Sequence, residues 1–141
     1  TKIIGLRYFN VFGKGQTLEY AGVITKFLDR IKQNKPPIIF GDGLQIRDFI
    51  FVEDVVKANL LAMTSNVSNL LVNIGTGKAI SILELASIMI KISDMKSNPI
   101  FKEELEGDIK KSQADISLAR NSFVWKPKKE LRNWLEEILN K

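Results

Sequence analysis

The chain has 141 residues, of which 45% are apolar and 26% charged, a mixture typical of a globular domain. It contains no cysteine and no histidine, which excludes a disulfide framework, a thiolate nucleophile and the commonest general base and zinc ligand. No run approaches the roughly eighteen apolar residues of a membrane helix, and the first residues lack the layout of a signal peptide. We therefore expect a cytoplasmic location and no membrane partner.

The formal net charge of +5, from 21 basic and 16 acidic residues, favours anionic partners such as a nucleotide diphosphate or a nucleic acid. The densest basic groups lie at residues 110–111 and 126–129. Such runs are typical of a solvated face, and neither clustered arginines nor interleaved aromatic residues accompany them. We expect no nucleic-acid partner.

The first part of the chain alternates short apolar runs with one helical pattern. Residues 2–9 predict a buried strand, followed by a loop at residues 10–16. Apolar residues recur at helical spacing over residues 20–34, and a proline pair ends that pattern. A strand at residues 38–40 then leads through a glycine turn into an extended segment at residues 44–52.

The remainder predicts more helices and one strand. Residues 53–64 indicate a helix with Val56, Leu60 and Met63 facing inward, and a strand follows at residues 70–74. Ser81 and Glu84 form a capping-box pattern at the start of a helix that runs to about residue 92. A short helix capped by Asp115 and a last amphipathic helix at residues 130–139 complete an α/β fold.

No complete dehydrogenase motif is present. The spacing Gly-x-Gly occurs three times, but a dinucleotide-binding fingerprint lacks its third glycine each time, at Leu18, Ile46 and Ile80. Neither tyrosine begins a Tyr-x-x-x-Lys motif. The residues alone therefore predict tight turns at these glycines and no self-sufficient active site.

Several motifs, taken in order, resemble the second half of UDP-sugar 4-epimerases, most closely UDP-glucose 4-epimerase. These enzymes belong to the NAD-dependent epimerase/dehydratase family of extended short-chain dehydrogenases. The matching segments lie at residues 6–13, 15–16, 19–24, 40–43, 45–50, 52–55, 72–77, 107–108, 114–116 and 125–127.

The resemblance implies that residues 1–141 form the C-terminal, substrate-binding part of a Rossmann-type enzyme, including the last strands of its sheet. The N-terminal half, absent here, would supply the glycine-rich NAD loop and the catalytic Tyr-x-x-x-Lys. In that family NAD takes a hydride from sugar C4, the 4-keto sugar turns over, and the hydride returns to the opposite face. We expect this chain alone to hold no catalytic residue and to be inactive, and the complete enzyme to be a homodimer.

The family's substrate contacts fall on identifiable positions. By resemblance, Asn10 hydrogen-bonds the sugar-diphosphate end of the UDP-sugar, and Arg47 grips the diphosphate with its guanidinium fork. Gly22, Val23 and Phe40 match positions that line the nucleotide base. Each has a structural alternative: a turn-forming asparagine, an ion pair between Arg47 and its neighbour Asp48, and ordinary core packing.

Three further positions follow from the same resemblance. Asp108 matches an aspartate that points at the ribose or the sugar. Tyr8 and Phe9 lie where the family approaches the nicotinamide of NAD, although aromatic residues on a central strand also pack in cores.

One departure from the family concerns charge. The family has an arginine two positions before Gly107, and this sequence has Leu105 there. The loss of such a contact costs about 1.5–3 kcal/mol unless another cation replaces it. We hypothesise that Lys110 or Lys111 substitutes.

Three functional alternatives stay open. Nucleotide-sugar 4,6-dehydratases resemble this region but tend to have tryptophan and histidine near Phe49 and Val55, and decarboxylases tend to have serine at the position of Asp48. A non-catalytic nucleotide-sugar binding fragment is the third. Because a chain without its N-terminal half would expose apolar surface, we also expect self-association.

Overall fold

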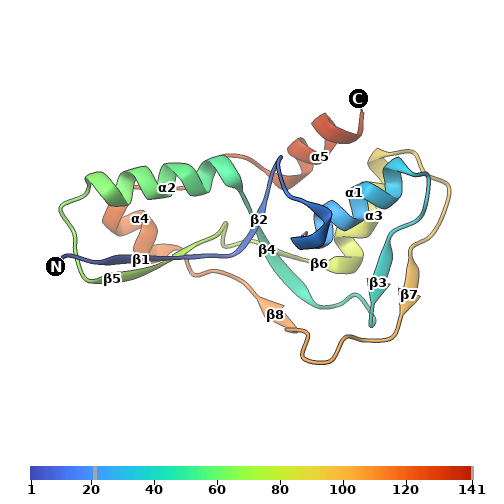
Figure 1. The fold of residues 1–141 in the computed structure, drawn as a ribbon, viewed down its shortest axis with the longest axis horizontal. Helices are drawn as coiled ribbons and strands as arrows, with labels where there is room; N and C mark the ends of the chain where they lie inside the picture. The colour runs from blue at the N-terminus through green and yellow to red at the C-terminus, as the bar shows by residue number, and fades with distance from the viewer. Residues whose placement is uncertain (21, 141) are drawn as a thin grey trace.

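The computed structural model describes residues 1–20 and 22–140 and confirms the α/β class. No helix within those residues is long and apolar enough to cross a membrane. The elements, labelled in Figure 1, are β1 (Ile4–Tyr8), β2 (Asn10–Phe12), the 3-10 helix η1 (Leu18–Tyr20), α1 (Val23–Lys32), β3 (Ile38–Phe40), β4 (Ile46–Phe51), α2 (Val52–Thr64), β5 (Leu70–Ile74), β6 (Ala79–Ser81), α3 (Ile82–Ile92), β7 (Ile100–Lys102), β8 (Lys111–Ser112), α4 (Ser117–Phe123) and α5 (Leu131–Leu139).

Strand β4 connects the two ends of the molecule (Figure 1). It pairs in parallel with β2 and β8 and antiparallel with β6. At one end β1 and β5 form a parallel pair, and at the other end β3 and β7 form another. The strand that carries Arg47 is therefore held by segments from widely separated parts of the chain.

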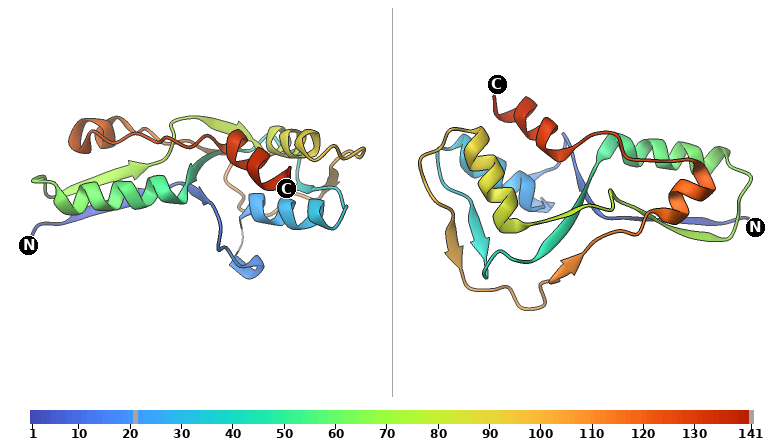
Figure 2. Two further views of the ribbon diagram at one scale, coloured as in Figure 1. Left: turned by 90° about the horizontal axis from the view of Figure 1, so that it is seen from above. Right: turned by 180° about the vertical axis from the view of Figure 1, so that it is seen from behind.

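One hydrophobic core forms where α1, α3 and α5 meet, and we call it the α1/α3/α5 cluster. The helices lie together in both views of Figure 2. Each helix buries apolar residues that lie at helical spacing along its own sequence, as the sequence predicts. They include Phe27 of α1, Leu85 of α3 and Leu135 of α5. The ring of Phe12, from β2, meets that of Trp134 edge-on with centroids 5.1 Å apart. This cluster fixes the position of β2 and β4.

A second core, the α2/α4 cluster, lies over one face of β1 and β5. Val72 and Ile74 of β5 pack with Ala58 of α2 and with Phe123 and Trp125 from the C-terminal part of the chain. The indole Nε1 of Trp125 donates a hydrogen bond to the carbonyl oxygen of Asp54 at 3.0 Å. The C-terminal segment is thereby tied to the start of α2.

Helix α2 has the expected length but not the expected orientation. The predicted inward residues are wrong, because Val56, Leu60 and Met63 are 52%, 56% and 80% exposed. The buried face instead carries Val55 and small alanines, including Ala58 and Ala62, which allow the helix to lie close to the strands. A helix with apolar residues on two faces gives no signal, from periodicity alone, of which face is buried.

The structure also tests the predicted capping residues and the predicted loop at residues 10–16. The helix start predicted at Ser81 is confirmed, since Ser81 is the N-cap of α3 and its Oγ accepts a hydrogen bond from the Glu84 amide at 3.0 Å. The N-cap of α4 is Ile116 and not the expected Asp115, although Asp115 Oδ1 accepts from the Ser117 amide at 2.9 Å; the hydrogen bonds from Ser117 lower the pKa of Asp115. The loop expected at residues 10–16 is partly wrong, because β2 begins at Asn10.

The segment expected as a helix at residues 20–34 begins later than predicted. Helix α1 starts at Val23, with Gly22 as its N-cap in an extended conformation. Tyr20 ends η1, and Ala21 lies outside the described residues. Strands β6, β7 and β8 were not predicted, because runs of two or three residues carry too little periodicity to be detected.

Candidate functional site

Asp48 is a buried junction at the centre of the molecule. Its carboxylate accepts hydrogen bonds from the Thr76 amide at 2.8 Å, the Thr76 hydroxyl at 2.6 Å, the Gly77 amide at 2.9 Å and the Ala114 amide at 3.1 Å. A Cβ atom at Gly75 would lie 2.6 Å from the Cβ of Ala114, so glycine there permits the close approach. Asp48 therefore joins β4 to two distant loops and does not pair with Arg47.

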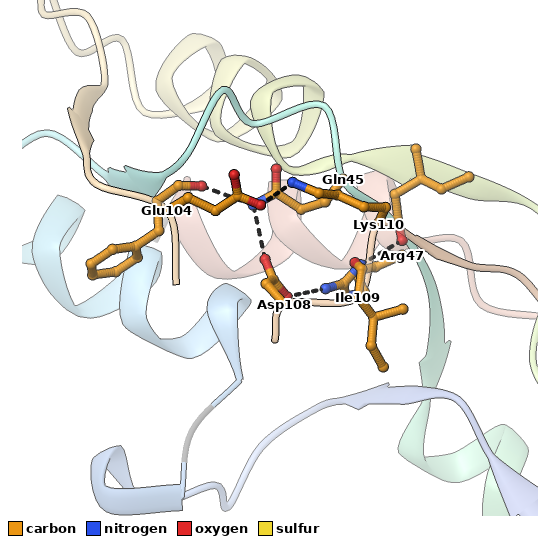
Figure 3. Close-up of polar contacts among 8 residues, drawn as sticks. Gln45, Arg47, Glu104, Asp108, Ile109 and Lys110 are labelled. Atoms are coloured by element: carbon orange, nitrogen blue, oxygen red, sulfur yellow. Dashed lines mark hydrogen bonds and ion pairs between the residues drawn. The ribbon is translucent and has the colours of Figure 1, made fainter. Parts of the chain in front are cut away.

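Arg47 is instead held by the loop that precedes β8 (Figure 3). Its Nη2 lies 2.5 Å from Oδ1 of Asp108, and the two side chains are only 14% and 24% exposed. Nη1 donates to the carbonyl oxygen of Ile46 at 2.9 Å and also to that of Ile109. The alternative of an Arg47–Asp48 ion pair is thus replaced by a contact across 61 residues of sequence.

Gln45 completes this group. Its Nε2 donates to the carbonyl oxygen of Phe40 at 2.9 Å and to Oδ2 of Asp108 at 3.2 Å. Asp108 therefore receives an arginine on one oxygen and an amide on the other, which fixes the orientation of its carboxylate. We call Gln45, Arg47 and Asp108, with the Phe40 carbonyl, the arginine network.

Asn10 lies next to a separate cavity of about 500 Å³. Its Nδ2 donates to the Asp48 carbonyl oxygen at 3.1 Å, which attaches the asparagine to β4. Tyr8 and Phe9 line the same cavity, together with Ser112. The structure thus brings Asn10 together with the two aromatic residues that the resemblance places near the nicotinamide.

Ser112 and Gln45 are the residues that the sequence reasoning missed. Ser112 lies in β8 directly opposite Arg47, so it connects the cavity beside Asn10 with the arginine network. Gln45 precedes Arg47 by two positions in an extended segment, where side chains two apart share a face. That periodicity could have identified Gln45, whereas no local signal could have identified Ser112.

The hydroxyl of Tyr8 forms its hydrogen bond outside the arginine network. Its hydroxyl donates to Oδ1 of Asn59 on α2 at 2.8 Å. The bond orients the ring at the end of β1 without placing it in the core, because 48% of Tyr8 stays exposed. Core packing is therefore not the role of this tyrosine.

Gly22 and Val23 stand apart from the arginine network. Gly22 caps α1, and Val23 packs against the α1/α3/α5 cluster. Within residues 1–20 and 22–140, no hydrogen bond joins either residue to Asn10, Arg47 or Asp108.

The lysines that could replace the arginine lost at Leu105 have different surroundings. Lys110 forms an ion pair with Glu104, and that hydrogen bond raises the pKa of Lys110 (Figure 3). Lys111 is exposed in β8, adjacent to Ser112. Of the two, Lys111 is the cation that no ion pair occupies among the described residues.

This arrangement suits binding and orientation of an anion. Arg47 is a charged fork with fixed geometry. Ser112, which pairs with Arg47 across β4 and β8, and Asn10, which bonds the backbone of β4, offer neutral hydrogen-bonding groups at the neighbouring cavity. Among the described residues, no cluster of three or more carboxylates or other metal-binding side chains is present.

A model of the NAD dependent epimerase/dehydratase family matches residues 1–75. The protein named "Putative UDP-glucose 4-epimerase" of Methanocaldococcus jannaschii is 43% identical over 136 residues, which are 96% of this chain and 44% of that protein. UDP-glucuronic acid decarboxylase 1 of Arabidopsis thaliana is 31% identical, over 95% of this chain and 31% of its own length.

Solved structures give the same picture. The UDP-glucose 4-epimerase of Thermotoga maritima, crystallised with UDP-glucose, superposes with a TM-score of 0.93 at 36% identity, over 99% of this chain and 45% of that one. The UDP-glucuronic acid 4-epimerase of Bacillus cereus, in complex with UDP-glucuronic acid and NAD, superposes with a TM-score of 0.86 at 31% identity, over 96% of this chain and 43% of that one. The chain thus spans less than half the length of these relatives. It has the fold of extended short-chain dehydrogenases and belongs to the NAD dependent epimerase/dehydratase family.

Proposed function

We propose that this chain is the UDP-sugar-binding part of a nucleotide-sugar 4-epimerase that interconverts hexose C4 epimers through a 4-keto intermediate. The observation that carries the proposal is the arginine network beside the cavity at Asn10. A fixed guanidinium next to neutral hydrogen-bonding groups is suited to a diphosphate joined to a sugar. The relatives named as UDP-sugar 4-epimerases support the same activity.

Each residue then has a role in holding the substrate. Arg47 neutralises the diphosphate, and its contact with Asp108 keeps the guanidinium aimed in one direction. Asn10 donates toward the sugar-diphosphate end, while Asp108 offers acceptor oxygens to hydroxyl groups of ribose or sugar. Phe40, Gly22 and Val23 are assigned to the base.

The residues near Asn10 fit the nicotinamide end of NAD. Tyr8 and Phe9 present aromatic surface at a cavity of about 500 Å³, which is large enough for a planar ring beside a sugar. NAD, when bound, supplies the hydride acceptor and donor for C4. Residues of this chain line the cavity beside the nicotinamide, and the hydrogen bond to Asn59 orients the Tyr8 ring.

The remaining part of the enzyme would cover two apolar surfaces. Parallel sheets are almost always covered on both faces, yet Leu71 on the uncovered face of β1 and β5 is 54% exposed. The outer stripe of α2, formed by Val56, Leu60 and Met63, is exposed as well. We propose that the NAD-binding half of the enzyme covers these surfaces. We also propose that the complete enzyme is a homodimer.

Calorimetric titration of the complete enzyme with UDP-glucose, UDP and NAD tests the substrate assignment. We expect Arg47→Lys to weaken UDP-glucose affinity about ten- to a hundredfold, because lysine cannot reproduce the planar fork. Arg132→Lys, on the exposed face of α5, is the matched control. If Arg47→Lys binds UDP-glucose as tightly as the unaltered protein, the arginine network is not the diphosphate site.

Product analysis separates the remaining alternatives. A C4 epimer of the supplied UDP-sugar supports the epimerase, and a 4-keto-6-deoxy product indicates a dehydratase. Release of carbon dioxide from UDP-glucuronic acid indicates a decarboxylase, a reaction named for one of the relatives. UDP-sugar binding with no product from the complete protein, including its NAD-binding half, indicates a non-catalytic binding protein.

A further inference from the structure

A second cavity, of about 410 Å³, lies among β4, β6, α3 and the segment that leads into α5. It shares no lining residue with the cavity beside Asn10, and Arg47 is the only member of the arginine network that reaches it. Its size lies in the ordinary range for small-molecule sites. The proposed epimerase function assigns a role to Arg47 but to none of the other residues that line this cavity.

The floor of this cavity is apolar. It consists of residues that belong to or pack against the α1/α3/α5 cluster, namely Phe49, Ile80, Ile88, Leu131 and Leu135. Aromatic and branched aliphatic side chains of this kind favour an apolar ligand body over a strongly hydrated ion such as inorganic phosphate.

The rim is strongly basic. Lysines and arginines supply most of its polar side chains, while Glu130 is its only carboxylate. The Nζ of Lys78 lies 3.4 Å from Oε1 of Glu130, so the negative charge of that carboxylate is already paired with Lys78. Among the described residues no ion pair is recorded for Arg120, Lys126 or Lys128. The rim therefore carries uncompensated positive charge directly above an apolar floor.

We propose that this cavity binds a small organic anion with an apolar body, of the class of aliphatic carboxylates. The body would pack on Ile88 and Leu135, and the carboxylate would face Lys126 and Lys128. Charge complementarity selects the anion, and the apolar floor excludes simple inorganic anions.

The test is calorimetric titration of the complete enzyme with octanoate and, separately, with octan-1-ol. Octanoate should bind about tenfold more tightly than octan-1-ol, and its affinity should fall as salt is added, because exposed charges are screened. Equal affinities, or binding of inorganic phosphate that is as tight as that of octanoate, would overturn the proposal.

Two variants locate the site. Lys126→Gln combined with Lys128→Gln should lower octanoate affinity about fivefold, since both lysines are exposed rim charges. Lys2→Gln combined with Lys96→Gln is the control and should have no effect. Ile88→Phe should fill the cavity and abolish octanoate binding while UDP-glucose binding persists. Unchanged octanoate affinity in both the rim variant and Ile88→Phe would assign the binding elsewhere.

Discussion

The helices around the two hydrophobic clusters differ in how they distribute their apolar residues. In the α1/α3/α5 cluster the helices present one apolar face each, and these faces meet one another around Phe12 and Trp134. In the α2/α4 cluster, α2 buries alanines inward and turns Leu60 and Met63 outward. The buried residues of both clusters are enclosed, but the face of α2 that points away from the α2/α4 cluster leaves apolar side chains exposed. Exposed stripes of this kind mark interfaces.

The largest expected effect tests the enclosed cluster. Leu85 is completely buried in α3, so Leu85→Ala should lower the free energy of unfolding by about 2–5 kcal/mol through lost burial and a residual cavity. Leu60→Ala on the outer face of α2 is the comparison and should change it by less than about 0.5 kcal/mol. Urea denaturation of both variants measures the difference. Similar losses would mean that the outer face of α2 contributes as much burial as the α1/α3/α5 cluster.

The second prediction concerns the junction between the clusters. Asp48→Asn should cost about 2–4 kcal/mol, because an amide nitrogen would face backbone N–H groups that now donate to a carboxylate. Asp29→Asn, on the surface of α1, removes the same charge as a control. Thermal and urea unfolding measure both. A neutral Asp48→Asn variant would show that the junction adds nothing to stability.

A smaller effect is expected at Asp54, which holds the C-terminal segment. Its Oδ2 accepts from the amides of Lys128 at 2.9 Å and Lys129 at 3.0 Å. Asp54→Asn keeps an acceptor but loses the charge, so we expect a loss of about 1 kcal/mol and faster hydrogen exchange at both amides. Glu53→Gln, at the neighbouring exposed position, should leave exchange unchanged. Unchanged exchange in Asp54→Asn would contradict this anchoring role.

The smallest effect on stability belongs to the outer stripe of α2. Leu60→Gln combined with Met63→Gln should alter unfolding free energy by less than about 1 kcal/mol, since both side chains already face solvent. The same double variant should reduce self-association of this chain in sedimentation velocity experiments. Glu53→Gln serves again as the control on the same helix. Self-association that persists at the original level would assign the interface to another surface.

The sequence predicts helices well where one face alone is apolar. The helical spacing of apolar residues within residues 20–34 and the capping-box pattern at Ser81 and Glu84 gave correct helices, α1 and α3. In α2 the same reasoning chose the wrong face, because alanines that pack closely contribute little to apolar periodicity. Which of two apolar faces is buried depends on tertiary contacts that lie far away in the sequence.

The candidate site shows a similar division. Resemblance identified Arg47 and Asp108 as separate positions, but their contact could not be predicted from spacing, since the loop before β8 returns to β4 only in the folded chain. For the same reason the role of Asp48 as a junction was not predicted. Short strands such as β6 and β8 were missed because their pairing, not their own sequence, makes them strands.

The position of β4 has a consequence for the rate at which the chain folds. Its partners β2 and β8 come from opposite ends of the sequence, so long loops must close before its backbone groups are paired. Chains dominated by such distant contacts fold slowly. During that interval the run Phe49, Ile50 and Phe51 is uncovered, and an apolar strand without partners is prone to pair with other chains. Newly made protein would therefore be most vulnerable to aggregation at the same strand that, once folded, carries Arg47.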